Sequence, residues 1–86
     1  MNIKGSKILV TGGSLGIGKA TAKALVDKGA TVVITGRNKT TLEKAASEIG
    51  AIPLVFDVSD LDSIPEKAAA CLEVLGGSLD VLVNNA

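Results

Sequence analysis

The sequence predicts a three-layer α/β fold built on one open, doubly wound parallel sheet, in the order β-α-β-α-β-α-β. Four short runs rich in β-branched and other apolar residues recur along the chain, and residues with helical periodicity fill the intervals. Apolar runs of this length are typical of strands buried on both faces. Strands that alternate with helices pair in parallel through right-handed crossovers. The 86 residues suffice for one small domain.

The strands and the first helix are expected in regular alternation. The four strand segments are 7–11, 31–35, 54–56 and 79–83. The first helix follows the glycine-rich segment behind the first strand. Its expected apolar face consists of Ile17, Ala20, Ala24 and Leu25.

The second helix has a regular apolar repeat and marked ends. Thr40 with Glu43 fits a capping box at its start. Gly50 stands where a left-handed C-terminal cap belongs. The residues at positions i, i+3, i+4 and i+7 of its face are Leu42, Ala45, Ala46 and Ile49.

The third helix has two possible starts, at Ser59 or at Ser63. Pro65 favours the second, since proline is tolerated in a first turn and costs about 3 kcal/mol inside a helix. Residues 60–62 then form a separate turn, and Gly76-Gly77 ends the helix. We expect Cys71 to act as a small core hydrophobe. The expected apolar face consists of Leu61, Ile64, Ala68, Cys71, Leu72 and Leu75.

The composition excludes several classes of site. The chain has no His, Tyr or Trp and a single Cys, which leaves out a His-based triad, a His or multi-Cys metal site, a disulfide and a tyrosine general acid. Zero net charge and 1% aromatic residues argue against nucleic-acid or anionic-membrane partners. No targeting signal or run of about 20 apolar residues is visible, so a cytoplasmic location is expected.

The strongest local signal is the segment Thr11-Gly12-Gly13-Ser14-Leu15-Gly16-Ile17-Gly18, which joins the first strand to the first helix. Such a junction binds anions, because backbone N–H groups and the positive end of the helix dipole point the same way. Glycines let the backbone approach a phosphate closely. The segment therefore predicts a phosphate-containing ligand. A turn that only connects strand and helix is the alternative.

Two other glycine motifs fit this segment less well. The dinucleotide fingerprint Gly-x-Gly-x-x-Gly lacks its last glycine, where Thr21 stands. A P-loop has the right spacing from Gly13 to Gly18-Lys19. However, Ala20 replaces the Ser or Thr whose hydroxyl binds Mg²⁺. A P-loop NTPase is therefore a less favoured alternative.

The spacing Thr-Gly-x-x-x-Gly-x-Gly resembles the short-chain dehydrogenase/reductase family. Thr11, Gly12, Gly16 and Gly18 match it in place. The resemblance continues over essentially the whole chain, through Gly36-Arg37-Asn38, Asp57-Val58 and Asn84-Asn85-Ala86. It implies a Rossmann-like sheet with strand order 3-2-1-4 and a nicotinamide dinucleotide cofactor.

The resemblance also implies a role for each matching residue. Backbone groups around Gly12, Ser14 and Ile17 would hold the adenosine side and the pyrophosphate. Asp57 and Val58 would contact the adenine, and Asn85 with Ala86 would pass beside the ribose. The implied cofactor-binding residues are Thr11, Gly12, Ser14, Gly16, Ile17, Gly18, Arg37, Asn38, Asp57, Val58, Asn85 and Ala86.

The end of the second strand favours NADP over NAD. NAD-binding members usually carry an acid there, which accepts from the ribose 2′-OH. This chain instead has Gly36-Arg37, and an arginine offers a planar, permanently charged fork for a 2′-phosphate. Leu15 stands where many NADP-using members carry a second basic residue.

Family catalysis uses a serine, a tyrosine and a lysine that all follow the Asn-Asn-Ala motif, and this chain has no tyrosine. No catalytic or metal-binding residue is therefore expected in it. We interpret residues 1–86 as the N-terminal part of one NAD(P)-binding domain of a longer enzyme that acts on alcohols or carbonyls and forms a homo-oligomer. Alone, with residues 79–83 as an unpaired edge strand, the chain is expected to be marginally stable or to self-associate. The alternative is a stand-alone nucleotide-binding module.

Overall fold

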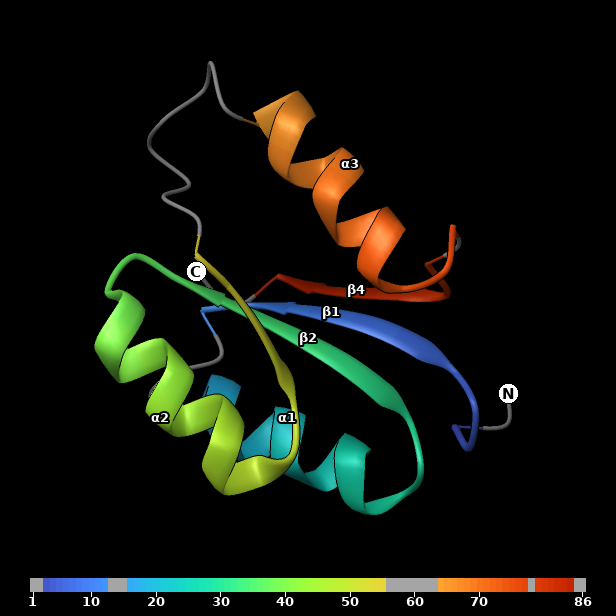
Figure 1. Ribbon diagram of the computed structural model, residues 1–86. Coiled ribbons are helices and arrows are strands. Elements are labelled where there is room, and N and C mark those ends of the chain that lie inside the picture. Colours follow the sequence, from blue (N-terminus) through green and yellow to red (C-terminus); the bar gives the residue numbers. More distant parts are fainter. Residues whose placement is uncertain (1–2, 13–15, 56–63, 78, 85–86) are drawn as a thin grey trace.

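The computed structural model describes residues 3–12, 16–55, 64–77 and 79–84. They form a four-stranded parallel sheet in the order β3-β2-β1-β4, which confirms the predicted fold and strand order (Figure 1). The elements in chain order are β1 (Lys7–Thr11), α1 (Gly16–Asp27), β2 (Thr31–Gly36), α2 (Lys39–Ile49), β3 (Ile52–Val55), α3 (Ile64–Val74) and β4 (Val81–Asn84).

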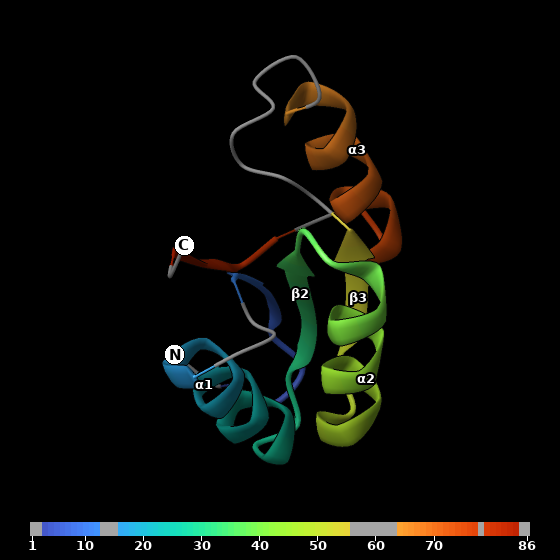
Figure 2. The same ribbon diagram turned by 90° about the vertical axis from the view of Figure 1, so that its left-hand side faces the viewer.

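Helices cover both faces of the sheet and make three layers. Helices α1 and α2 lie on one face and α3 lies on the other (Figures 1 and 2). The larger core cluster packs on the α1 and α2 side, and the smaller one on the α3 side. The largest fully buried side chains of the first are Ile8, Val10, Val32, Ile34 and Leu42. The buried residues of the second are Val33, Cys71 and Leu75.

Helix α1 presents only part of the predicted apolar face to the sheet, since Leu25 packs against the core but the other three residues do not. Gly18 and Ala22 are buried, whereas Ala20 and Ala24 are exposed. Ile17 is 77% exposed, so its assignment to the core was wrong. The reason is size: residues without bulky side chains let the helix backbone approach the sheet closely. The close approach, rather than hydropathy, sets the rotation of α1.

Helix α2 buries the predicted face but begins with a different cap. All four predicted residues of the repeat are buried. The cap at its start is Asn38, whose side-chain oxygen accepts from the Thr41 N–H at 3.1 Å. The predicted capping box of Thr40 and Glu43 was therefore wrong, because the helix begins at Lys39 and already includes both residues. The predicted C-terminal cap is confirmed, since Gly50 has φ 79° and its N–H donates to Ala46 O.

Helix α3 begins at Ile64, which confirms a start near Ser63 with Pro65 in the first turn. The buried thiol of Cys71 packs in the core as predicted, and burial raises its pKa. Residues 56–63, including the predicted 60–62 turn and Leu61, lie outside the described residues. So do the side chains of Ile64, Ala68 and Leu72.

Strands β3 and β4 differ in their bounds from the predicted segments. β3 begins two residues early, because Ile52 already pairs with Val33, and Phe56 lies outside the described residues. β4 begins late, at Val81, because Asp80 instead bridges back to the start of β1. The Lys7 N–H donates to Asp80 Oδ2 at 2.7 Å. β4 forms an edge of the described sheet, as predicted.

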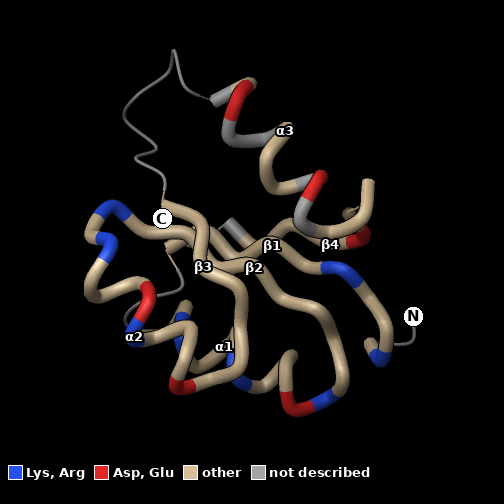
Figure 3. Tube along the Cα trace, in the orientation of Figure 1, with Lys and Arg blue, Asp and Glu red and all other residues tan. Residues whose placement is uncertain are grey.

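Charged residues of both signs lie on the helices and toward the strand ends (Figure 3). The middle of the described sheet carries none. Among the described helices none could cross a membrane, since the longest, α1, has 12 residues and a span needs about 20.

Candidate functional site

The carboxyl ends of all four strands meet at one edge of the sheet. Val10 pairs with Val83 on one side and with Ile34 on the other, so β1, β2 and β4 run in the same direction and end together. Gly36 pairs with Val55, which brings the end of β3 to the same edge. In open α/β sheets, ligands bind in the crevice outside the carboxyl ends of the strands. We refer to this side of the sheet as the carboxyl edge.

The glycine-rich segment leaves the sheet at this edge in conformations that only glycine adopts readily. Gly12 has φ 69° and Gly16 has φ 58°. A side chain at either position would be strained whatever space surrounds it. Two side-chain hydrogen bonds hold the start of the segment. Thr11 Oγ1 donates to Val83 O at 3.4 Å, and the Gly12 N–H donates to Thr35 Oγ1 at 3.3 Å.

Helix α1 begins at Gly16, so its first turn lies within the last part of this segment. The first N–H groups of a helix have no acceptor inside it and lie at the positive end of its dipole. The first turn carries no acidic side chain that would compete with an anion for these groups. The buried Gly18 and the exposed Ile17 lie in the same turn. This arrangement suits a phosphate or diphosphate approached by backbone amides.

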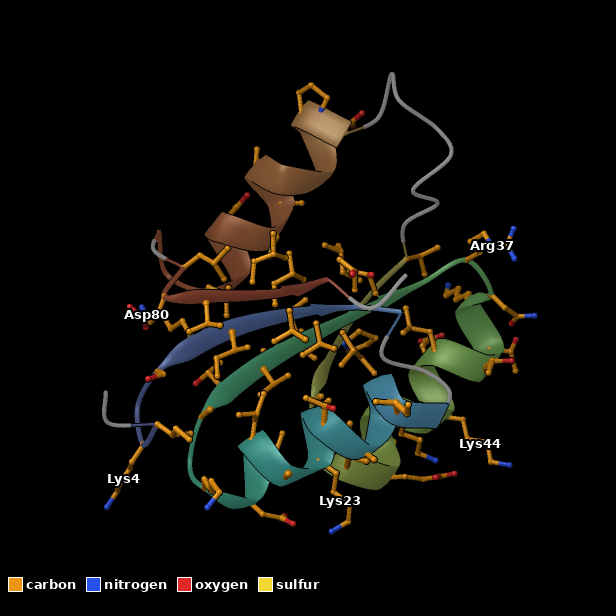
Figure 4. The ribbon with its side chains drawn as sticks, turned by 180° about the vertical axis from the view of Figure 1, so that it is seen from behind. Lys4, Lys23, Arg37, Lys44 and Asp80 are labelled. Atoms are coloured by element: carbon orange, nitrogen blue, oxygen red, sulfur yellow. The ribbon has the colours of Figure 1, made fainter. Side chains whose placement is uncertain are left out.

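Arg37 and Asn38 follow β2 at the same edge. The Arg37 side chain is exposed and extends away from the sheet beyond the start of α2, at the end of the sheet opposite Asp80 (Figure 4). Asn38 caps α2 through its side-chain oxygen. In the described part of the chain the ion pairs are Lys19–Glu48 and Lys23–Asp27, and neither engages Arg37. A guanidinium in this position can take an anionic group in bidentate fashion.

Lys19 is turned toward α2. Its Nζ lies 2.5 Å from Glu48 Oε2, and this hydrogen bond and charge hold the pKa of the Glu48 carboxyl below its ordinary value. In a P-loop the corresponding lysine reaches the nucleotide phosphates. The ion pair with Glu48 therefore disfavours the NTPase alternative.

The structure places the predicted site residues that it describes at or beside the carboxyl edge. They are Thr11, Gly12, Gly16, Ile17, Gly18, Arg37 and Asn38. The predicted residues Ser14, Asp57, Val58, Asn85 and Ala86 lie outside the described residues. Sequence reasoning missed Thr35, which holds the Gly12 amide. Its one sequence signal is a hydroxyl residue directly after an apolar run of three residues, Val32 to Ile34.

Comparison with known protein families matches residues 6–86 to the family described as short chain dehydrogenase. This chain belongs to the short-chain dehydrogenase family. The match confirms the resemblance drawn from the glycine spacing and covers nearly all of the chain. It also implies a nicotinamide dinucleotide as the family's cofactor.

Individual relatives agree with the family assignment. The gluconate 5-dehydrogenase of Gluconobacter oxydans is 43% identical over 90 residues, which cover 99% of this chain and 35% of the relative. The sorbitol dehydrogenase of Cereibacter sphaeroides is 42% identical over 88 residues, which cover 100% of this chain and 34% of the relative. This short-chain dehydrogenase chain thus spans about a third of the length of these relatives and corresponds to their N-terminal portion.

Solved structures give the same result for the fold. A short chain dehydrogenase from Bacillus anthracis superposes with a TM-score of 0.88 at 38% identity, covering 98% of this chain and 35% of the other. A protein from Thermus thermophilus superposes with a TM-score of 0.82 at 47% identity, covering 94% and 33%. At these identities the likeness extends beyond the fold to the family.

The residues at the carboxyl edge fit the cofactor that the family implies. Gly12 and Gly16 keep the positive φ that a close backbone approach requires, and Gly18 is buried without a side chain. The start of α1 offers amides to a diphosphate. The exposed Arg37 offers positive charge one strand away.

Proposed function

We propose that this chain forms the NADP(H)-binding portion of an oxidoreductase that interconverts alcohols and carbonyls. One observation carries the proposal: a glycine segment with positive φ leads into the start of α1 at the same sheet edge as the β2–α2 turn with Arg37. The names of two relatives, a gluconate 5-dehydrogenase and a sorbitol dehydrogenase, indicate substrates with oxidisable hydroxyl groups. A bound nicotinamide dinucleotide supplies the hydride donor or acceptor.

The backbone between residues 11 and 18 would hold the diphosphate. Gly12 and Gly16 keep the chain close to the ligand, and amides near Ser14 and Ile17 would donate to its oxygens. These contacts bind and orient the cofactor and would serve NAD(H) and NADP(H) alike. They therefore account for affinity but not for the choice between the two.

Arg37 would determine the preference for NADP(H) over NAD(H). A 2′-phosphate accepts bidentate, charge-assisted hydrogen bonds from a guanidinium, whereas a ribose 2′-OH is recognised by an acid. No acid follows β2 in the turn of residues 36–38. Asn38 would lie beside the same phosphate, with its oxygen already used to cap α2.

The remaining cofactor contacts come from the third and fourth strands. Asp57 and Val58 would contact the adenine, and Asn85 with Ala86 would lie beside the ribose. Residues 1–86 would be the first part of a single dinucleotide-binding domain in a cytoplasmic, homo-oligomeric enzyme. The groups that transfer a proton to the substrate would lie in the longer protein, since this chain has no tyrosine.

The test is a titration of the protein expressed from its complete gene with NADPH and NADH, by calorimetry. We expect NADPH to bind more tightly. Arg37→Asp should weaken NADPH binding by about tenfold to a hundredfold, the range expected for lost hydrogen bonds to a charged group. Lys28→Asp, directly after the far end of α1, makes the same charge change and should leave both affinities unaltered. Equal affinities of the wild type for NADH and NADPH would contradict the NADP(H) assignment.

A further inference from the structure

Thr35 is a buried polar residue near the end of β2, whose other polar side chain, Thr31, is exposed. The relative exposure of Thr35 is 4%, and the three residues before it, Val32 to Ile34, are almost fully buried. It lies at the carboxyl edge, where it pairs with Leu54 of β3 and precedes Gly36. A valine would have the same shape and would suit this strand position equally well. The hydroxyl therefore needs an explanation beyond packing.

The Thr35 hydroxyl accepts a hydrogen bond just beyond the last backbone pair of β1 and β2. The last paired residues there are Val10 and Ile34. Two residues further on, Gly12 turns out of the sheet with φ 69°, and its N–H donates to Thr35 Oγ1 at 3.3 Å. A side chain, rather than a strand carbonyl, thus accepts the first amide of the glycine segment. The direction in which this segment leaves the sheet depends on that acceptor.

This contact links the two halves of the proposed cofactor site. Gly12 begins the segment that leads to α1, and Thr35 is two residues before Arg37. On the other side of β1, Thr11 Oγ1 donates to Val83 O. The start of the segment is therefore held from both neighbouring strands. Because the Gly12 amide is engaged by Thr35, the described amides that are left for a diphosphate are those at the start of α1.

We infer that Thr35 is a positioning residue for the dinucleotide: its hydroxyl accepts from the Gly12 amide and so holds the start of the glycine segment in place. This inference rests on the proposed function. Since the diphosphate is common to both cofactors, the loss of the hydroxyl weakens NADH and NADPH binding by the same factor. Arg37 acts differently, because it changes the ratio of the two affinities.

The experiment compares three variants of the protein expressed from its complete gene. Thr35→Val removes the hydroxyl and keeps the shape of the side chain. It should weaken the binding of both cofactors by about fivefold, the effect of one neutral hydrogen bond. Thr35→Ser keeps the hydroxyl and should restore most of the affinity. Thr31→Val makes the same change at the exposed, opposite end of β2 and should alter neither affinity.

A second measurement keeps the test valid if Thr35→Val fails to fold. It is the hydrogen exchange rate of the Gly12 amide, followed by NMR without cofactor in the wild type and in Thr35→Ser. The amide should be protected in both. Unaltered affinities in Thr35→Val, a loss confined to NADPH, or an unprotected Gly12 amide in the wild type would each overturn the inference. A wild type that binds neither cofactor would overturn the proposed function itself, whatever the variants do.

Discussion

The carboxyl edge of the sheet and the opposite edge, where the strands begin, are held together in different ways. At the edge where the strands begin, the Thr31 N–H donates to Ser6 O at 2.8 Å, a bond between two backbone groups. At the carboxyl edge, the contacts around the glycine segment come from the hydroxyls of Thr11 and Thr35, at 3.4 and 3.3 Å. Where the strands begin, the sheet is closed by backbone bonds and by the Asp80 carboxylate, which accepts from the Lys7 N–H. The start of the glycine segment at the carboxyl edge depends instead on hydroxyls and on glycines with positive φ. Changes where the strands begin should therefore affect stability, and changes at the carboxyl edge should affect ligand binding.

Two glycines with matched surroundings test this separation with the largest expected effect. Gly16 at the carboxyl edge and Gly77 behind α3 both have positive φ, and a Cβ at either would meet nothing within 4 Å. Alanine in the left-handed region should therefore reduce the free energy of unfolding by a similar amount at both, about 1–2 kcal/mol. Only Gly16→Ala should also weaken NADPH binding, by about tenfold, because it moves the amides that we propose hold the diphosphate.

Calorimetric titration and chemical denaturation of both variants measure the two effects separately. Equal losses of NADPH affinity in Gly16→Ala and Gly77→Ala would show that binding follows general stability. The distinction between the two edges would then fail.

The opposite edge is tested at Asp80, with a smaller expected effect. Its carboxylate accepts from the Lys7 N–H at 2.7 Å, and its own N–H donates to Lys7 O at 2.8 Å. Asp80→Ala removes the first bond, and because Asp80 is exposed we expect a loss of about 1 kcal/mol in the free energy of unfolding. Asp27→Ala, which removes a surface ion pair with Lys23, serves as the control and should cost less. A loss of cofactor affinity in Asp80→Ala would contradict the assignment of this edge to stability.

The smallest expected effect is on the pH dependence of stability and involves Glu48 of α2, which forms an ion pair with Lys19 of α1. The folded pKa of Glu48 lies below the ordinary carboxyl value of 4.5, so the ion pair stabilises the fold fully above that pH. The contribution is lost as the pH falls through the lowered folded pKa. Because the pair is exposed, added salt should reduce it. On acidification, the melting temperature of the wild type should fall slightly more steeply than that of Glu48→Gln. Identical dependence of the two melting temperatures on pH would contradict the prediction.

The sequence predicted the fold well because its signals were redundant. Apolar strand segments, short connections and the α2 repeat all point to one parallel arrangement, and an error in any single bound leaves the topology unchanged. The face of α1 was predicted only in part because hydropathy ranks Ile17 above Gly18 and Ala22. At a close contact between helix and strand, small size decides instead.

The cap of α2 and the role of Thr35 show a second limit. Asn38 and Thr40 are both good cap residues, and the choice depends on where β2 ends, which local patterns locate only to within a few residues. Thr35 is an ordinary strand residue by composition. Its importance comes from Gly12, 23 positions earlier, and only the pairing of β1 with β2 brings them together.

The most direct test of the account is to map NADPH onto the backbone amides of the protein by NMR. We expect large shift changes at Gly12, Gly16 and Arg37 on titration, and little change at Lys7 and Asp80 at the opposite end of the sheet. Shift changes centred on that opposite end, or none at the glycine segment at saturating NADPH, would contradict the proposed cofactor site.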